Sequence, residues 1–133
     1  MKSKQVLSVE QMKHLQEIGL ELRNTSMLLW YKQMLGKIPI SDWELSVWRE
    51  SIFSEDHVYP AYTLQDILDK LPCFIGNEVL TIQKLADSYT CLYMEPYSRS
   101  MINITESKEL IDAVYDMLCW CIENGYVKVG KEE

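Results

Sequence analysis

The chain has 133 residues, of which 47% are hydrophobic and 25% are charged, proportions typical of one globular domain. No apolar run approaches about 18 residues, so we expect no membrane span, and no apolar signal core follows the first residues. The net charge of −7 argues against a protein that binds nucleic acid by neutralising phosphates. We therefore expect one cytoplasmic domain over residues 1–133, with flexible ends at 1–6 and 130–133.

The first helix is predicted over residues 8–18. Ser8 and Gln11 have the spacing of a capping box, in which each side chain binds the backbone amide of the other residue. Met12 and Leu15 form a narrow apolar face. A glycine directly after this segment is expected to end the helix.

The next segment, residues 26–33, fits either a helix or a strand that is buried on both faces. We favour the strand, because a short connection leads from it to a clearer strand over residues 43–47. There, apolar and polar residues alternate with a period of two. Residues 49–60 are polar and irregular, and we interpret them as a loop.

A short helix is predicted over residues 63–71, with Thr63 as the N-cap and a proline after its last turn. Three strands are expected to follow, at residues 79–85, 89–95 and 101–104. The first two are separated by a link of hairpin length, which favours antiparallel pairing.

The last helix is predicted over residues 107–125. Apolar residues recur along it at the spacing of one helix face, and either Thr105 or Ser107 is expected to provide the N-cap oxygen. Gly125 is expected to end it. Residues 126–129 form a short strand or coil.

The predicted fold class follows from this order of elements. The order is α-β-β-α-β-β-β-α, and short links between strands favour antiparallel neighbours. We therefore predict an α+β domain in which an antiparallel sheet of about five strands carries three helices.

Three segments carry a resemblance to a known group of proteins. They are residues 8–15 (SVEQMKHL), 61–68 (AYTLQDIL) and 110–126 (LIDAVYDMLCWCIENGY). They resemble small uncharacterised proteins of phages and mobile elements in Bacteroides-type gut bacteria. The resemblance implies a bacterial, phage-related context, and it implies no activity, cofactor or site residue.

The residues that bear reactive groups form no recognisable catalytic or metal-binding motif. Cys119 and Cys121 lie about 200° apart on one helix, and no Cys-x-x-Cys pair is present. Asp112 and Asp116 are one helical turn apart and would suit a divalent metal or acid–base chemistry, but a solvated helix face is the favoured interpretation. His57 lies beside acids and serines in one loop, which does not give the geometry of a triad. We predict no catalytic residue, metal, cofactor or disulfide.

A cluster of aromatic residues is the most suggestive functional signal. Tryptophan and tyrosine are enriched at protein interfaces, where rigid rings bury much area. The candidate binding residues combine apolar anchors with an acidic rim: Trp48, Phe53, Glu55, Asp56, His57 and Tyr59.

We accordingly predict a non-enzymatic interaction or accessory protein, encoded by a prophage, that modulates a host protein. The expected partner is a protein; nucleic acid and membrane are not expected, and a homo-oligomer is compatible with the sequence. One alternative is a small metal-dependent or hydrolytic enzyme that uses Asp112 and Asp116 or His57. A second alternative is an acidic DNA mimic, with carboxylates between residues 42 and 69 arrayed on one ridge.

Overall fold

The computed structural model describes residues 4–21, 27–30, 34–35, 38–39, 44–46 and 58–129, with side chains described in 4–21 and 60–129. The helices in these residues are α1 (Val9–Glu17), α2 (Leu64–Lys70) and α3 (Leu110–Glu123). The strands before α2 are β1 (Met27–Trp30), β2 (Met34–Leu35), β3 (Ile38–Pro39), β4 (Glu44–Ser46) and β5 (Val58–Ala61). The strands between α2 and α3 are β6 (Phe74–Ile75), β7 (Glu78–Lys84), β8 (Tyr89–Met94) and β9 (Met101–Ser107). The α+β class predicted from the sequence is confirmed.

The strands are divided among separate sheets. The main sheet has the order β6-β7-β8-β9, and each neighbouring pair is antiparallel. A second sheet has the order β4-β1-β5, and β2 pairs with β3. The main sheet therefore has four strands instead of about five, because the strands before α2 pair among themselves and not with the strands that follow α2.

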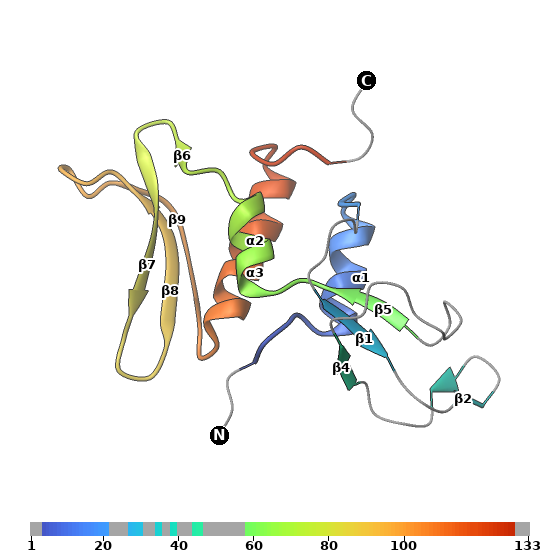
Figure 1. Cartoon of the computed structure of the whole chain (residues 1–133). Helices are drawn as coiled ribbons and strands as arrows, with labels where there is room; N and C mark the ends of the chain where they lie inside the picture. The colour runs from blue at the N-terminus through green and yellow to red at the C-terminus, as the bar shows by residue number, and fades with distance from the viewer. Residues whose placement is uncertain are drawn as a thin grey trace.

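Helices lie between the main sheet and the second sheet. In Figure 1 the main sheet is on the left, α2 and α3 are in the middle, and β1, β4 and β5 are on the right. α3 packs directly on β8 and β9, α2 packs on α3, and α1 packs on β5. Within the described residues, no helix combines the length and the apolar character needed to cross a bilayer.

The first two helices begin where the sequence predicts. Ser8 Oγ accepts the Gln11 amide at 3.1 Å, and Gln11 Oε1 accepts the Ser8 amide at 2.9 Å. Thr63 and Asp66 form the same reciprocal pair before α2, at 3.2 and 2.9 Å. Gly19 follows α1 with a φ of +109°, a conformation that side chains with a Cβ rarely adopt, so a glycine ends this helix as predicted.

The start of α3 differs from the prediction. The N-cap is Glu109, whose side chain makes no capping bond, so the expected N-caps Thr105 and Ser107 are wrong. Both residues belong to β9, which is longer than predicted and pairs with the full length of β8. The Thr105 hydroxyl instead donates to the carbonyl oxygen of Ala113 at 2.7 Å and so connects β9 to α3.

The predicted loop over residues 49–60 is wrong at its C-terminal end. Residues 58–61 form β5, which pairs with β1 along Met27–Trp30. β5 contains Pro60, which has no amide hydrogen to donate, and β5 is an edge strand, where proline is tolerated. The favoured strand over residues 26–33 is confirmed for residues 27–30, and the strand over residues 43–47 is confirmed for 44–46.

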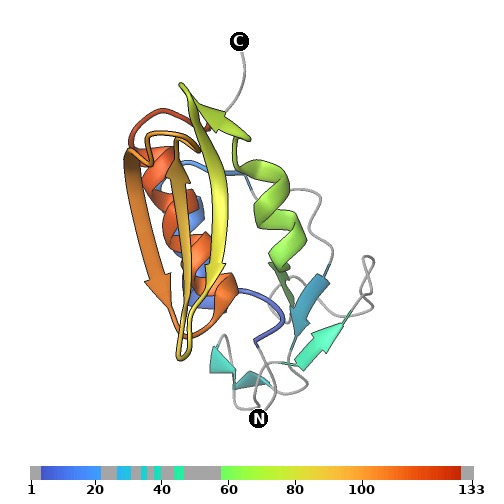
Figure 2. The same ribbon diagram turned by 90° about the vertical axis from the view of Figure 1, so that its left-hand side faces the viewer.

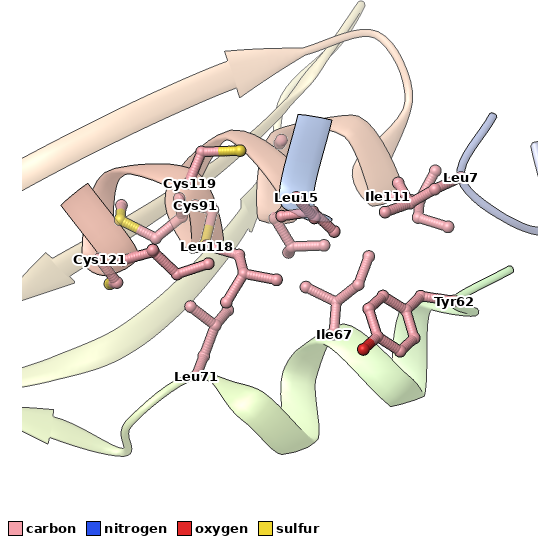
Figure 3. Packing of buried hydrophobic residues seen from close by; sticks show 14 of the residues in the cluster. Leu7, Leu15, Tyr62, Ile67, Leu71, Cys91, Ile111, Leu118, Cys119 and Cys121 are labelled. Atoms are coloured by element: carbon pink, nitrogen blue, oxygen red, sulfur yellow. The ribbon is translucent and has the colours of Figure 1, made fainter. Parts of the chain in front are cut away.

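The hydrophobic core lies between the three helices and one face of the main sheet. Figure 3 shows Leu15 from α1, Ile67 from α2 and Leu118 from α3 pointing toward one another. Each of these side chains is fully buried. Val6 is also buried and forms a bridge with Thr63, although it falls within the N-terminal end that the sequence predicts to be flexible.

Candidate functional site

The binding segment predicted from the sequence lies almost entirely outside the described residues. Trp48, Phe53, Glu55, Asp56 and His57 all belong to the part of the chain that is not described. Tyr59 is described in its backbone alone. It lies in β5, where it pairs with Leu29 of β1. A role for this segment in binding therefore stays a prediction.

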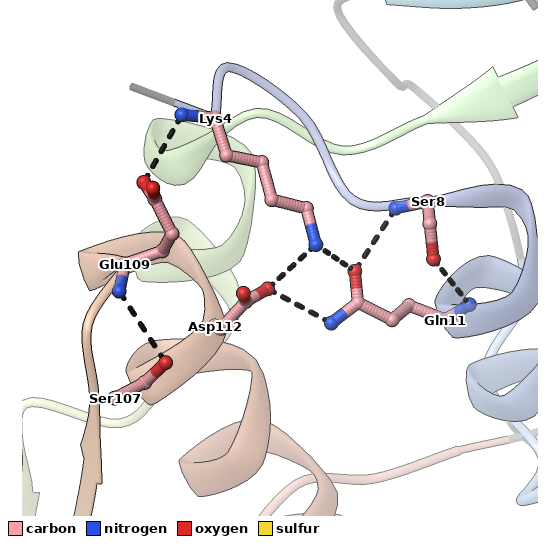
Figure 4. Close-up of polar contacts among 6 residues, drawn as sticks. All are labelled: Lys4, Ser8, Gln11, Ser107, Glu109 and Asp112. Atoms are coloured by element: carbon pink, nitrogen blue, oxygen red, sulfur yellow. Dashed lines mark hydrogen bonds and ion pairs between the residues drawn. The ribbon is translucent and has the colours of Figure 1, made fainter. Parts of the chain in front are cut away.

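Asp112, one of the two candidate catalytic carboxylates, is part of a structural polar cluster. Figure 4 shows its carboxylate beside Lys4 and Gln11. Asp112 Oδ1 accepts hydrogen bonds from Lys4 Nζ at 2.7 Å and from Gln11 Nε2 at 2.9 Å. Lys4 Nζ also donates to Gln11 Oε1 at 2.7 Å, and its backbone amide donates to Glu109 Oε1 at 3.0 Å. These contacts join the N-terminal segment and α1 to the first turn of α3.

The other carboxylate, Asp116, has a raised pKa. Partial burial is the larger cause, and the negative charge of Asp112 is the smaller. A metal site would instead require several ligands around one point. Among the described residues, no group of three or more His, Cys, Asp or Glu side chains could hold a metal ion.

The acidic ridge expected of a DNA mimic is only partly described. Of the carboxylates between residues 42 and 69, Asp66 is engaged in the capping box of α2, and Asp69 accepts a hydrogen bond from Gln65 at 2.8 Å. Asp42, Glu50, Glu55 and Asp56 lie outside the described residues, and Glu44, in β4, is described in its backbone alone. The described part of this region therefore gives no support to a solvent-facing acidic ridge.

Three of the four cysteines are buried in the core, and all four are free. Burial raises the pKa of Cys91 to about 12 and that of Cys121 to about 11, so both thiols are protonated near neutral pH. The neighbouring Tyr93 hydroxyl donates to the carbonyl oxygen of Pro72 at 2.7 Å. Neutral thiols are poor nucleophiles and poor metal ligands, and these cysteines pack as apolar residues.

The main sheet has one face that no described helix covers. Figure 2 looks onto this face, with β7, β8 and β9 in front of α3. Cys91 and Tyr93 of β8 belong to the core on the α3 side. Because side chains alternate along a strand, Leu92 and Met94 lie on the opposite side. We call this side of the main sheet the outer face.

The strand register places an apolar row across the whole outer face. Phe74 pairs with Val79, Val79 with Met94, and Met94 with Met101, so that one residue comes from each of the four strands. We call these four residues the apolar row. Phe74 is 64% exposed and Met101 is 54% exposed, which is unusual for side chains of this size.

The polarity of the outer face changes from one cross-strand row to the next. Beside the apolar row, Leu92 pairs with Thr81 on one side and with Ile104 on the other. Ile104 is 49% exposed, whereas Leu92, between its neighbours, is only 2% exposed. The following row is polar and consists of Gln83, Thr90 and Glu106. The face is therefore apolar at one end and hydrophilic at the other.

One local feature of the sequence does indicate this face, although the predicted elements make no use of it. Residues 91–94 are a continuous apolar run, Cys-Leu-Tyr-Met, which is typical of a strand packed on both faces. β6 was not predicted at all, because a strand of two residues leaves no periodic pattern. Without β6, the position of Phe74 beside Val79 could not be foreseen.

Comparison with known proteins finds no matching family model, no matching curated protein and no matching solved structure. Functional inference therefore rests on the geometry of this chain.

Proposed function

We propose that this chain is a non-enzymatic interaction protein that binds a protein partner through the outer face of its main sheet. The observation that carries the proposal is the apolar row, Phe74, Val79, Met94 and Met101, which is aligned by the strand register and has large exposed side chains at both ends. Soluble domains rarely leave contiguous apolar surface exposed unless it binds something. A role as a phage-related accessory protein that modulates a host protein agrees with this proposal.

The arrangement of polarity also suits a protein interface. Protein interfaces combine an apolar centre with a polar rim. Here Leu92 and Ile104 lie next to the apolar row, and Thr90 and Glu106 lie one row further along. Each large apolar side chain that becomes fully buried on binding contributes about 1.5–3 kcal/mol to the binding free energy. This contribution is smaller for a side chain that is already partly buried in the free protein.

An enzymatic function receives no comparable support. Asp112 is engaged by Lys4 and Gln11, and among the described residues no group of three or more His, Cys, Asp or Glu side chains could hold a metal ion. The thiols in the core are buried and protonated near neutral pH. No second function is proposed for these residues.

The proposal can be tested by site-specific photo-crosslinking. The photo-reactive residue p-benzoylphenylalanine would replace Phe74 in one variant, Ile104 in a second, and Gln65, an exposed residue of α2, in a control. The variants would be irradiated in bacterial lysate and their adducts identified by mass spectrometry. We expect one defined protein to attach at Phe74 and Ile104 but not at Gln65.

A competition experiment makes the test specific. Unlabelled wild-type protein should suppress the adducts, Phe74→Asp should suppress them poorly, and Leu85→Asp should behave as wild type because Leu85 lies at the hairpin end, away from the apolar row. Equal labelling at all three positions, or none at either outer-face position, would exclude the outer face as an interface.

The segment predicted from the sequence remains a separate candidate for the same function. Replacement of Trp48 and Phe53 by alanine, with the fold verified by circular dichroism, would test it in the same crosslinking assay. A loss of the adducts would place part of the interface in residues 48–59, and unchanged adducts would remove this segment from consideration.

A further inference from the structure

β9 is an edge strand with one side unoccupied by any strand in the described residues. The sheet order β6-β7-β8-β9 gives it a neighbour on one side alone. It is seven residues long, Met101–Ser107, and contains neither proline nor lysine. Natural proteins protect an edge of this length with such residues or with a bulge, because its unpaired amides and carbonyls would otherwise pair with another strand. The irregularity of β9 is confined to its N-terminal end, and residues 103–107 pair regularly with β8.

The hydrogen-bond pattern identifies which backbone groups are free at this edge. The amide of Leu85 donates to the Ser88 carbonyl oxygen at 2.8 Å and so closes the β7–β8 hairpin. Hydrogen-bonded pairs alternate along an antiparallel ladder. The even-numbered residues of β8 therefore direct their backbone groups toward β7, as Ser88 does, and the odd-numbered residues direct theirs toward β9. The Glu95 amide agrees with this alternation: it belongs to an odd-numbered residue and donates to the Ser100 carbonyl oxygen, on the β9 side, at 2.8 Å.

The register then fixes the orientation of each residue in β9. Cys91 pairs with Thr105 and Tyr93 with Asn103, so these residues of β9 direct their backbone groups toward β8. The backbone groups of Ile104 and Glu106 consequently point to the open edge. The register shift between Tyr93 and Met94 leaves Ile102 as the extra residue at a bulge.

From this pattern we infer that β9 pairs antiparallel with β9 of a second copy of the chain, about a two-fold axis at Ile104. This inference goes beyond the proposed function, since edge pairing uses β9 and leaves Phe74, on β6 at the opposite edge of the sheet, available to a protein partner. An antiparallel pair of identical strands is related by a two-fold axis, and an axis at Ile104 uses the outward backbone groups of both Ile104 and Glu106 in each copy. Two four-stranded sheets would join into one continuous antiparallel sheet.

The side chains of β9 are self-complementary in this register. Ile104 lies opposite Ile104 of the second copy, Ile102 opposite Glu106, and Asn103 opposite Thr105. No two like charges are directly opposite, and cross-strand pairs of β-branched residues stabilise a ladder. The row that contains Leu92 and Ile104 would continue across the axis into the same row of the second copy.

The charges at the two ends of β9 favour the same orientation. Arg99 precedes the strand, whereas Glu106, Lys108 and Glu109 lie at or just beyond its other end and together leave a net negative charge there. Antiparallel pairing brings the Arg99 end of one strand to the glutamate end of the other. Opposite charges therefore meet at both ends of the pair, although the chain as a whole is acidic.

The experiment measures mass and amide protection together. Light scattering after size exclusion should give twice 15.6 kDa for the wild type, and the mass should fall on dilution. Hydrogen exchange should show the amides of Ile104 and Glu106 protected in the dimer, although both point away from β8. A wild type that is monomeric at every concentration, or a dimer in which these two amides exchange freely, would overturn the inference.

Two variants separate edge pairing from general destabilisation. Ile104→Lys places two positive charges opposite each other at the axis and should weaken the dimer by about tenfold or more. Ile82→Lys is the matched control, because Ile82 is similarly exposed, at 39%, and lies on β7 away from the open edge. Ile104→Pro provides a second test, because proline lacks the amide hydrogen that Ile104 directs to the open edge. It should weaken the dimer without removing a hydrogen bond to β8. Dimers of unchanged strength in Ile104→Lys would refute the inference.

The outcome also separates the inference from the proposed function. A monomeric wild type whose outer face crosslinks to a different protein would overturn self-pairing and leave the interaction function standing. A monomer without crosslinks at Phe74 and Ile104 would refute both.

Discussion

Leu118 provides the most direct test of the core, because it lies on α3 where all three helices meet the sheet. Its side chain is 0% exposed and points toward Leu15 of α1 and Ile67 of α2. We propose to replace it with alanine. The matched control is Leu85→Ala, which removes the same atoms from a leucine that is 44% exposed at the end of the β7–β8 hairpin.

The expected magnitude follows from the burial. Leu118→Ala removes about three methylene-sized groups from the core, each worth about 0.8 kcal/mol, or about 2.4 kcal/mol in total. The cavity left behind adds about 1 kcal/mol, because the surrounding helices relax only in part. We therefore expect the free energy of unfolding to fall by about 3.5 kcal/mol, a large share of the total stability of a domain.

Thermal unfolding followed by circular dichroism measures this effect. For 133 residues the entropy of unfolding is about 0.28 kcal/mol per kelvin, so the melting temperature should fall by about 12 °C. The control should fall by a few degrees at most, since Leu85 already contacts solvent. If Leu118→Ala and Leu85→Ala lowered the melting temperature equally, α3 would not lie at the centre of the core.

Three further predictions concern the cysteines, a buried hydroxyl and a carboxylate. Alkylation at about pH 8 should modify only Cys73 in the folded chain, because Cys73 is exposed and burial raises the pKa of Cys91 to about 12. Mass spectrometry before denaturation would contradict this prediction if it showed more than one adduct per chain. Tyr93→Phe removes the donor to the Pro72 carbonyl oxygen and should lower the free energy of unfolding in urea by about 1–3 kcal/mol; no change would argue against this bond. The pKa of Asp116 is raised in the folded state, so the stability associated with its protonated form is present at low pH and is lost as the pH rises through that pKa. Asp116→Asn should therefore raise the melting temperature at about pH 7 and leave it unchanged at about pH 3, and equal effects at both values would refute the sign of the shift.

The candidate interface shows how far the sequence alone could reach. The strands that form most of it were predicted within a few residues, because alternation and a short hairpin link are visible locally. The apolar row was not predicted, since it depends on the register of four strands and on a two-residue strand at Phe74. The role of Asp112 was also missed, because its partner Lys4 lies 108 positions away in the chain.

The sequence by itself determined the helices and strands that are specified by residues only a few positions apart in the chain. Ser8 with Gln11 and Thr63 with Asp66 specify the helix starts, because a capping box involves only residues three apart. The tertiary structure alone decided how the described strands are shared among three sheets, that β5 pairs with β1, and which face of the main sheet stays open. The physical reason is that pairing and register depend on the sum of packing over distant segments, and no single residue carries that information.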